Sequence, residues 1–218
     1  TISGGTVEVQ SVSGAAIGGG SSGFGFSGEG AITRGVGGSG GTITISGGSV
    51  TATTMTGRSI SLFSEMNEGR WAGAAIGGGS CGGGSGGSSG TITISGGIVT
   101  AIVSSQPAPG MDPDVPPKYS AGIGNGAGTG VSVVGSSKIT ISGGTVFAQS
   151  PDGAGIGDGQ NNDGSAIVIA ISGGTVEAVS TNGAGIGGGM IEALSAMVNF
   201  EKTYSGGKIT ISGGSVSA

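Results

Sequence analysis

The chain has 218 residues, of which 56 are glycine and only 9% are charged. Its formal net charge is −5, with seven basic residues and no histidine. The sequence therefore has no basic cluster of the kind that binds nucleic acid, and it lacks the commonest general base and zinc ligand. No apolar run is long enough to cross a bilayer as a helix, so we expect no membrane span.

The four-residue sequence Ile-Ser-Gly-Gly recurs along the whole chain. A short β-branched run follows each copy, and five copies are followed later by a second motif, Ala/Gly-Ile-Gly. Consecutive motifs stand 15 residues apart where the repeat is shortest, as from Ile141 to Ile156 to Ile171. Such self-similarity predicts a stacked repeat architecture. The first motif begins at Ile2, Ile45, Ile94, Ile141, Ile171 and Ile211, and the second is centred on Ile17, Ile76, Ile123, Ile156 and Ile186.

Within a repeat the apolar residues alternate with hydroxyl residues, as in Thr42–Ile45 and Thr91–Ile94. A period of two places the isoleucines on one face of a strand, and the following Gly-Gly allows a sharp corner. We predict an all-β chain, a parallel β-solenoid with loop insertions at its corners; an antiparallel sandwich would not need the same corner at the same offset. The residues expected to stack in inward ladders are Ile43, Ile45, Val50, Ile92, Ile94, Val99, Ile139, Ile141, Val146, Ile171, Val176, Ile209 and Ile211.

Three segments interrupt the repeats, at residues 54–71, 103–120 and 189–207 of a single domain that spans residues 1–218. They hold the only tryptophan, both tyrosines and all but one of the prolines. Insertions in solenoids emerge as loops at a corner and often build the binding face. We therefore expect all three segments to lie outside the regular coils.

One segment could bind a metal ion. Asp158, Asn161, Asn162 and Asp163 offer oxygen ligands on a glycine-rich turn, which suits calcium. The spacing fits no EF-hand, and clusters of Asp, Asn and Gly are also ordinary turn chemistry. Calcium and a plain turn both remain open, and the sequence indicates no other cofactor.

The aromatic residues of the insertions could bind carbohydrate. Trp71, Tyr119 and Tyr204 offer flat rings that could stack on sugars, and the competing interpretation is that they cover the ends of the apolar column. Glycans are therefore possible partners.

Catalytic residues are hard to find in this sequence. Glu8 and Glu177 occupy equivalent repeat positions, but neither has an evident acidic partner for glycoside cleavage. Cys81 is the only cysteine, which excludes an intramolecular disulfide and a thiolate metal cluster. We expect that the chain is not an enzyme.

The repeats Ile139–Val146 and Gly153–Gly157 resemble the glycine-rich β-helical repeat regions of secreted surface proteins and adhesins. This resemblance implies an extracellular or cell-surface location and a structural role, as a fibre subunit or adhesin stalk. It leaves two alternatives: a carbohydrate-binding surface module and a β-helical enzyme that cleaves polysaccharides.

The two ends of the sequence carry the same motif, at Thr1–Gly5 and Lys208–Val216. An open parallel coil exposes unpaired backbone groups, so the last coil of one chain could stack head-to-tail on the first coil of another. The chain could equally be a fragment of a longer protein.

Overall fold

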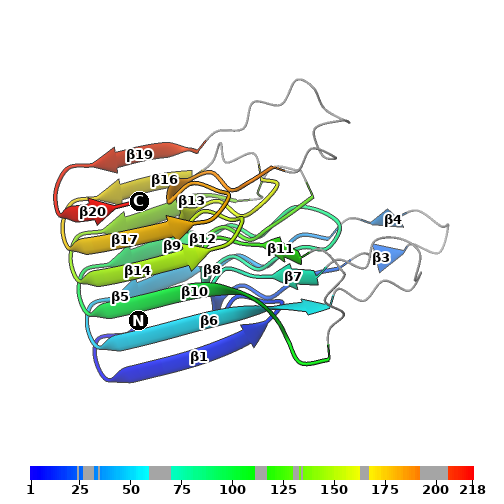
Figure 1. The fold of residues 1–218 in the computed structure, drawn as a ribbon, viewed down its shortest axis with the longest axis horizontal. Coiled ribbons are helices and arrows are strands. Elements are labelled where there is room, and N and C mark those ends of the chain that lie inside the picture. Colours follow the sequence, from blue (N-terminus) through cyan, green and yellow to red (C-terminus); the bar gives the residue numbers. More distant parts are fainter. Residues whose placement is uncertain are drawn as a thin grey trace.

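The structure is a computed structural model that describes residues 1–23, 25–26, 32–33, 35–58, 70–110, 117–129, 133, 135–162, 167–191 and 206–218. Most of the described strands pair in parallel in three sheets, through which the chain winds coil after coil (Figure 1). The antiparallel pairs among the described strands are β3 (Gly25–Phe26) with β4 (Ile32–Thr33) and the end of β6 (Ser49–Arg58) with β7 (Arg70–Ala72). The β-solenoid predicted from the repeats is confirmed. Among the described residues no helix is long and apolar enough to cross a membrane.

The first sheet contains the Thr-Ile-Thr-Ile strands and their equivalents. Its order is β19-β16-β13-β9-β5, so each strand pairs with the same strand of the coils before and after it. The strands are β5 (Thr42–Ile45), β9 (Gly90–Ile94), β13 (Ser137–Ile141), β16 (Ile167–Ile171) and β19 (Lys208–Ile211).

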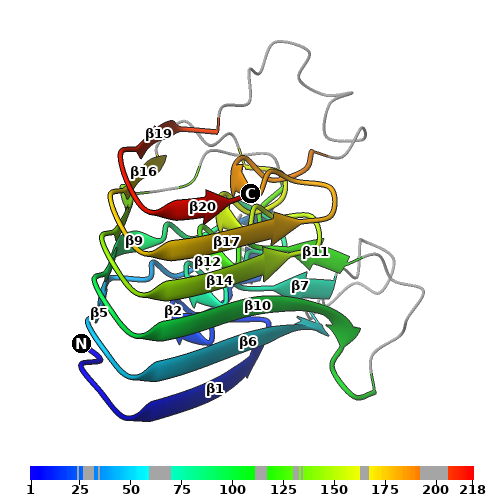
Figure 2. The ribbon, with the colours of Figure 1, turned by 60° about the vertical axis from the view of Figure 1, so that its left-hand side comes forward.

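The second sheet contains the β-branched runs that follow Gly-Gly. Parallel pairing connects β1, β6, β10, β14, β17 and β20 in this order, which forms the broad layer seen in Figure 2. These strands are β1 (Thr6–Val12), β6 (Ser49–Arg58), β10 (Ile98–Pro107), β14 (Thr145–Ser150), β17 (Thr175–Ser180) and β20 (Ser215–Ser217).

The third sheet is narrow and contains the Ile-Gly pairs of the second motif. Its order is β18-β15-β12-β8-β2. The strands are β2 (Ile17–Gly18), β8 (Ile76–Gly77), β12 (Ile123–Gly124), β15 (Ile156–Gly157) and β18 (Ile186–Gly187). Outside the coils, β3 (Gly25–Phe26) and β4 (Ile32–Thr33) form an antiparallel ribbon.

Glycine permits both the corner and the close stacking of the coils. The second glycine of every Ile-Ser-Gly-Gly has a positive φ, for example +83° at Gly48, which other residues rarely adopt. In the second motif, Gly77 has a φ of +136°, and a Cβ added to it would lie 2.0 Å from the carbonyl oxygen of Gly124 in the next coil. Both motifs therefore require glycine at these positions.

A second stack of glycines closes the side of the solenoid beyond the third sheet. Its backbone hydrogen bonds zigzag between two passes of the chain: Gly38 N to Gly20 O at 2.8 Å, Gly79 N to Gly38 O at 2.9 Å, Gly87 N to Gly79 O at 2.8 Å and Gly126 N to Gly87 O at 2.9 Å. The runs of glycine thus join coils, and here they act as structure rather than as flexible linkers.

The core consists of the predicted ladders. Of the thirteen residues expected to point inward, all are buried except Ile209 and Ile211, which are 40% and 51% exposed. These two stack in register on Ile169 and Ile171 as predicted, but they stay partly exposed because β19 pairs only with β16 and has no described coil on its other side. The same ladder runs from Ile2 through Ile45, in register, to Ile211.

The strands extend into two of the predicted insertions. β6 continues to Arg58 and β10 to Pro107, and two further short strands, β7 (Arg70–Ala72) and β11 (Pro117–Tyr119), pair in parallel with each other. The prediction that residues 54–71 and 103–120 lie wholly outside the coils is therefore wrong at their ends. Residues 59–69, 111–116 and 192–205 lie outside the described residues.

Candidate functional site

Buried polar side chains gather where the coils leave the third sheet. Asn125 Nδ2 donates a hydrogen bond to Asp158 Oδ1 at 2.6 Å, across two adjacent coils. The Oδ1 atom of Asn125 accepts hydrogen bonds from Ser137 Oγ at 2.6 Å and from the backbone N–H of Ser89 at 2.7 Å. All four residues are buried, so this network joins three successive coils in a water-poor interior.

The backbone geometry that carries these side chains is the same in every coil. Two residues after each isoleucine of the second motif, the backbone carbonyl accepts a hydrogen bond from the alanine four residues earlier, as in Ala154 N to Asp158 O at 2.8 Å. Other coils have glycine at this position, for example Gly78 and Gly188. Asn125 and Asp158 are thus two polar substitutions in an otherwise glycine column, and sequence reasoning missed Asn125 although aligned repeats would have revealed it.

Gln160 connects this network to Tyr119. The backbone N–H of Gln160 donates to Tyr119 O at 2.9 Å, and Gln160 Oε1 accepts from Tyr119 N at 3.1 Å. Gln160 therefore pairs with the backbone N–H and C=O of Tyr119 on the edge of β11 that faces away from β7, as a neighbouring strand would. The structure brings together two candidates, the Asp158–Asn162 turn and Tyr119, that the sequence treated as separate sites.

The described part of the predicted calcium segment is a buried, hydrogen-bonded turn. Asp158, Asn161 and Asn162 are buried, and Asp158 Oδ1 already faces the N–H donor of Asn125. The side-chain amide of Asn162 donates to the carbonyl of Gly126. No group of three acidic, histidine or cysteine side chains comes together in the described part of the chain, but calcium also takes amide and backbone carbonyl oxygens, so calcium binding at this turn stays a prediction. Asp163 lies outside the described residues.

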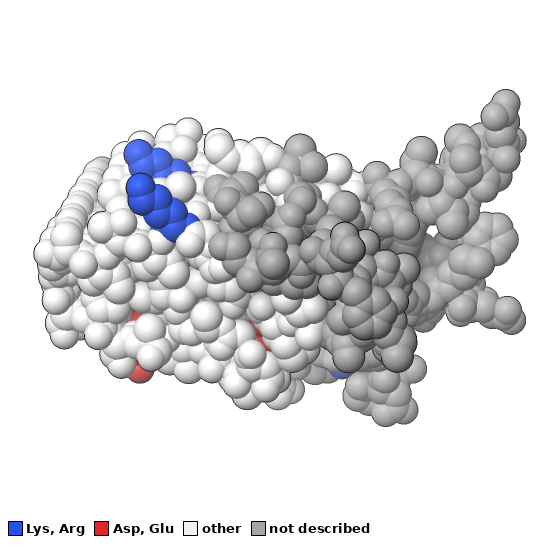
Figure 3. All heavy atoms as spheres, turned by 90° about the horizontal axis from the view of Figure 1, so that it is seen from above, with Lys and Arg blue, Asp and Glu red and all other residues white. Residues whose placement is uncertain are grey.

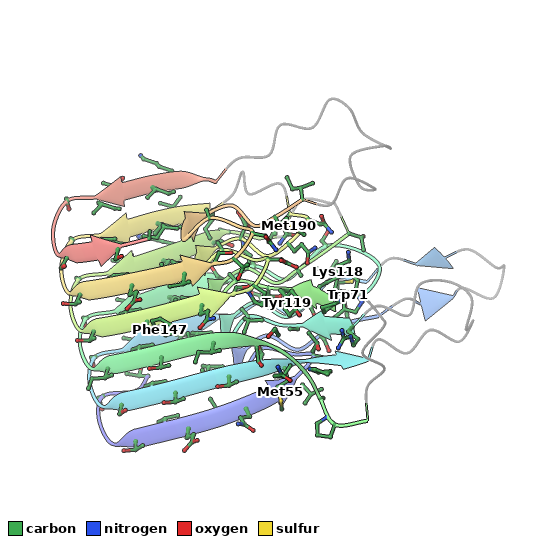
Figure 4. The ribbon with its side chains drawn as sticks, viewed as in Figure 1. Met55, Trp71, Lys118, Tyr119, Phe147 and Met190 are labelled. Atoms are coloured by element: carbon green, nitrogen blue, oxygen red, sulfur yellow. The ribbon has the colours of Figure 1, made fainter. Side chains whose placement is uncertain are left out.

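Two of the three aromatic candidates are buried. Trp71 and Tyr119 are each 5% exposed, so the prediction that they offer ring faces to a sugar is wrong. Figure 4 shows them with Lys118 at one corner of the solenoid, where Lys118 pairs with Trp71 and Tyr119 with Ala72 between β11 and β7. They belong to strands beside the second and third coils and not to the ends of the apolar column, where the competing interpretation placed them, while Tyr204 lies outside the described residues.

The environment of Tyr119 favours its neutral form. Burial is the largest cause that raises the pKa of the phenol, and the negative charge of Asp152 raises it further, whereas Arg70 acts in the opposite direction. The hydroxyl lies 3.5 Å from the carbonyl oxygen of Ser105. Tyr119 is therefore a neutral core residue at physiological pH.

The two glutamates in equivalent positions do not form a catalytic pair. Glu8 and Glu177 lie in one outward column of the second sheet, with Thr51, Thr100 and Phe147 between them. Four coil spacings separate them, about 19 Å at the usual strand distance. Glycosidases hold their two carboxyl groups at most about 9.5 Å apart, so this column lacks that geometry.

Comparison with known families supports the architecture. A family model described as a beta helix repeat matches residues 1–21, 92–130, 139–160 and 169–190, a little under half of the chain. The matched segments hold most of the strands of the second and third sheets, from β1 to β18. No curated protein and no solved structure matches the chain. The chain therefore contains a β-helix repeat region.

Proposed function

We propose that the chain is an extracellular structural protein, a stalk or fibre segment built from stacked β-solenoid coils, without catalytic activity. The observation that carries this proposal is the unbroken register of one ladder through six coils. Val7, Val50, Val99, Val146, Val176 and Val216 pair in succession along the second sheet. A column in which each coil is hydrogen-bonded to the next lengthens by about 4.8 Å per coil and resists bending.

The outer surface of the solenoid is mostly uncharged, which fits a structural role. The first sheet displays hydroxyl residues in register, with Thr44, Thr93 and Thr140 pairing in succession on its outer side. In the view from above, most of the described surface carries no charge; Lys or Arg atoms gather mainly in one group, and a few Asp or Glu atoms are scattered toward one edge (Figure 3). The extracellular placement is supported by the resemblance of the repeats to those of secreted surface proteins.

Head-to-tail association is part of the proposal. Ile211 and Ile209 are exposed in a ladder whose inner members are buried, and Ile2 stands at the opposite end of the Ile211 column. A further coil placed on β19 and β20 would cover both side chains. A second copy of the chain, entering with its first coil, would supply the same motif and the same register, and so would a further repeat of a longer chain.

Electron microscopy of native material labelled with an antibody tests the structural role, and we expect thin rods. For the purified chain we expect a sedimentation coefficient that rises with protein concentration. In the Ile211→Asp variant the coefficient should stay at the value of the unassociated chain, whereas the Lys208→Ala variant should behave like the unsubstituted chain. Compact, unassociated particles in both experiments would contradict the proposal. Saturable binding on a glycan array, or cleavage of acidic polysaccharides, would instead favour the carbohydrate-binding module or the enzyme.

A further inference from the structure

The chain contains two Asn-Gly dipeptides, Asn125-Gly126 and Asn182-Gly183, in very different surroundings. Asn-Gly is chemically the most labile of the asparagine sequences, because glycine has no Cβ to obstruct attack by its own nitrogen and reaches many backbone angles. Asparagine is among the thermolabile residues of proteins. The two dipeptides therefore offer a direct comparison within one molecule.

Asn125 is buried, and hydrogen bonds restrain both its side chain and the backbone nitrogen that follows it. Its side chain is 1% exposed, its Oδ1 accepts two hydrogen bonds, and its Nδ2 donates to Asp158. The nitrogen of Gly126, which would have to attack, donates to Gly87 O at 2.9 Å inside the glycine stack. Reaction at this position would require several buried hydrogen bonds to break together.

Asn182 is exposed and held by fewer bonds. It lies in the bend after β17, and its side chain makes one hydrogen bond, from Nδ2 to Asp152 Oδ1 at 2.8 Å, at the surface. The Gly183 nitrogen donates to Ser180 Oγ at 2.9 Å, a side chain that can rotate. Water reaches this bend, whereas it does not reach Asn125.

We propose that Asn182-Gly183 is a site of spontaneous covalent modification by deamidation. The Gly183 nitrogen loses its proton and bonds to Cγ of Asn182, the bond from Cγ to Nδ2 breaks, and ammonia leaves with that proton. Water then opens the resulting succinimide at either carbonyl, giving aspartate or isoaspartate. One water is consumed and one ammonia released, and no other reactant is needed.

The product changes the contact between two coils. Asp152 and Asn182 occupy the same corner of successive repeats, and the hydrogen bond between them becomes an approach of two carboxylates. Like charges at this distance repel, although salt weakens the effect at an exposed position. Isoaspartate also adds a methylene to the backbone of the corner. Deamidation at Asn182 therefore loosens one corner of the stack.

The test is incubation of the purified chain in mildly alkaline buffer at physiological temperature, followed by peptide mapping with fragmentation that separates aspartate from isoaspartate. We expect conversion at Asn182 roughly tenfold faster than at Asn125 or more, because additional buried hydrogen bonds must break at Asn125. Ser180→Ala, which frees the Gly183 nitrogen, should accelerate conversion at Asn182 alone, and Asn182→Gln should abolish it.

Two results would overturn the proposal. One is conversion at Asn125 that is as fast as at Asn182. The other is an unreacted Asn182 over a period in which a synthetic peptide, Ser-Thr-Asn-Gly-Ala-Gly, converts under the same conditions. Because neither result depends on whether the chain forms rods, they are independent of the proposed structural role.

Discussion

Asn125 and Asp158 are stacked in adjacent coils, with Asn125 Nδ2 2.6 Å from Asp158 Oδ1, at a position where other coils have glycine. A buried carboxylate is costly unless it is hydrogen-bonded, and Asn125 supplies one of the hydrogen bonds that Asp158 receives. In turn, Ser89 and Ser137 donate to Asn125. Removal of either side chain therefore leaves a buried polar group of the other without that hydrogen-bond partner.

Replacement of Asn125 by glycine should destabilise the fold more than replacement of both residues. The single variant leaves buried polar groups unsatisfied, at about 1–3 kcal/mol each. The double variant Asn125→Gly, Asp158→Gly also removes the carboxyl group that the single variant leaves buried, and it places glycine where Gly78 and Gly188 stand in other coils; Ser89 and Ser137 lose the Asn125 acceptor in both variants. Denaturant unfolding of the two single variants and the double variant should show a coupling of about 0.5–3 kcal/mol. If the losses in the free energy of unfolding of the two single variants added up to the loss of the double variant, the two side chains would not depend on each other.

Gly77→Ala should disrupt the stacking of the third sheet. The new Cβ would meet the Gly124 carbonyl oxygen at 2.0 Å, and the φ of +136° is strained for alanine. We expect a loss of at least about 3 kcal/mol in the free energy of unfolding, since strain of this kind alone costs about 1–3 kcal/mol. Thermal and denaturant unfolding measure it.

Gly20→Ala is the matched control. Gly20 lies in the equivalent glycine run of the first coil, but nothing lies within 4 Å of its added Cβ and its φ is not positive. The change should remain within about 0.5 kcal/mol. An equal loss in both variants would mean that chain flexibility, and not the approach of the coils, explains the need for glycine.

Ile141→Asp and Ile211→Asp compare two positions of one ladder. Ile141 is fully buried, so an aspartate there should cost roughly 3–5 kcal/mol or more. Ile211 is 51% exposed, and the same substitution should cost less than about 1 kcal/mol in the unassociated chain. Denaturant unfolding at low protein concentration measures the loss of each variant. Equal losses would show that Ile211 is buried even in the unassociated chain.

The repeats made most of the architecture predictable. Apolar residues at period two and a glycine pair at a fixed offset determine strand, corner and register, so the ladders through Ile45, Ile94 and Ile141 followed from spacing alone. The candidate sites were less predictable. Whether Trp71 and Tyr119 face solvent depends on β7 and β11, which pair across a long insertion and leave no periodic signal. Asn125 was overlooked because an amide among glycines looks like turn chemistry until its neighbours in other coils are known.

Tyr119 should make stability depend on pH in the alkaline range. Its pKa in the folded chain is raised above the ordinary 10.0, mainly by burial, so the folded state holds the phenol proton more tightly than the unfolded state does. The stabilising contribution is complete below pH 10.0, where both states are neutral. It is lost as the pH rises through the raised pKa, because the unfolded chain ionises first. Denaturant unfolding of the chain and of Tyr119→Phe across this window should show a steeper loss in the unsubstituted chain. Lysines titrate alike in both proteins, so the difference reports Tyr119, and parallel losses would contradict its burial in the neutral form.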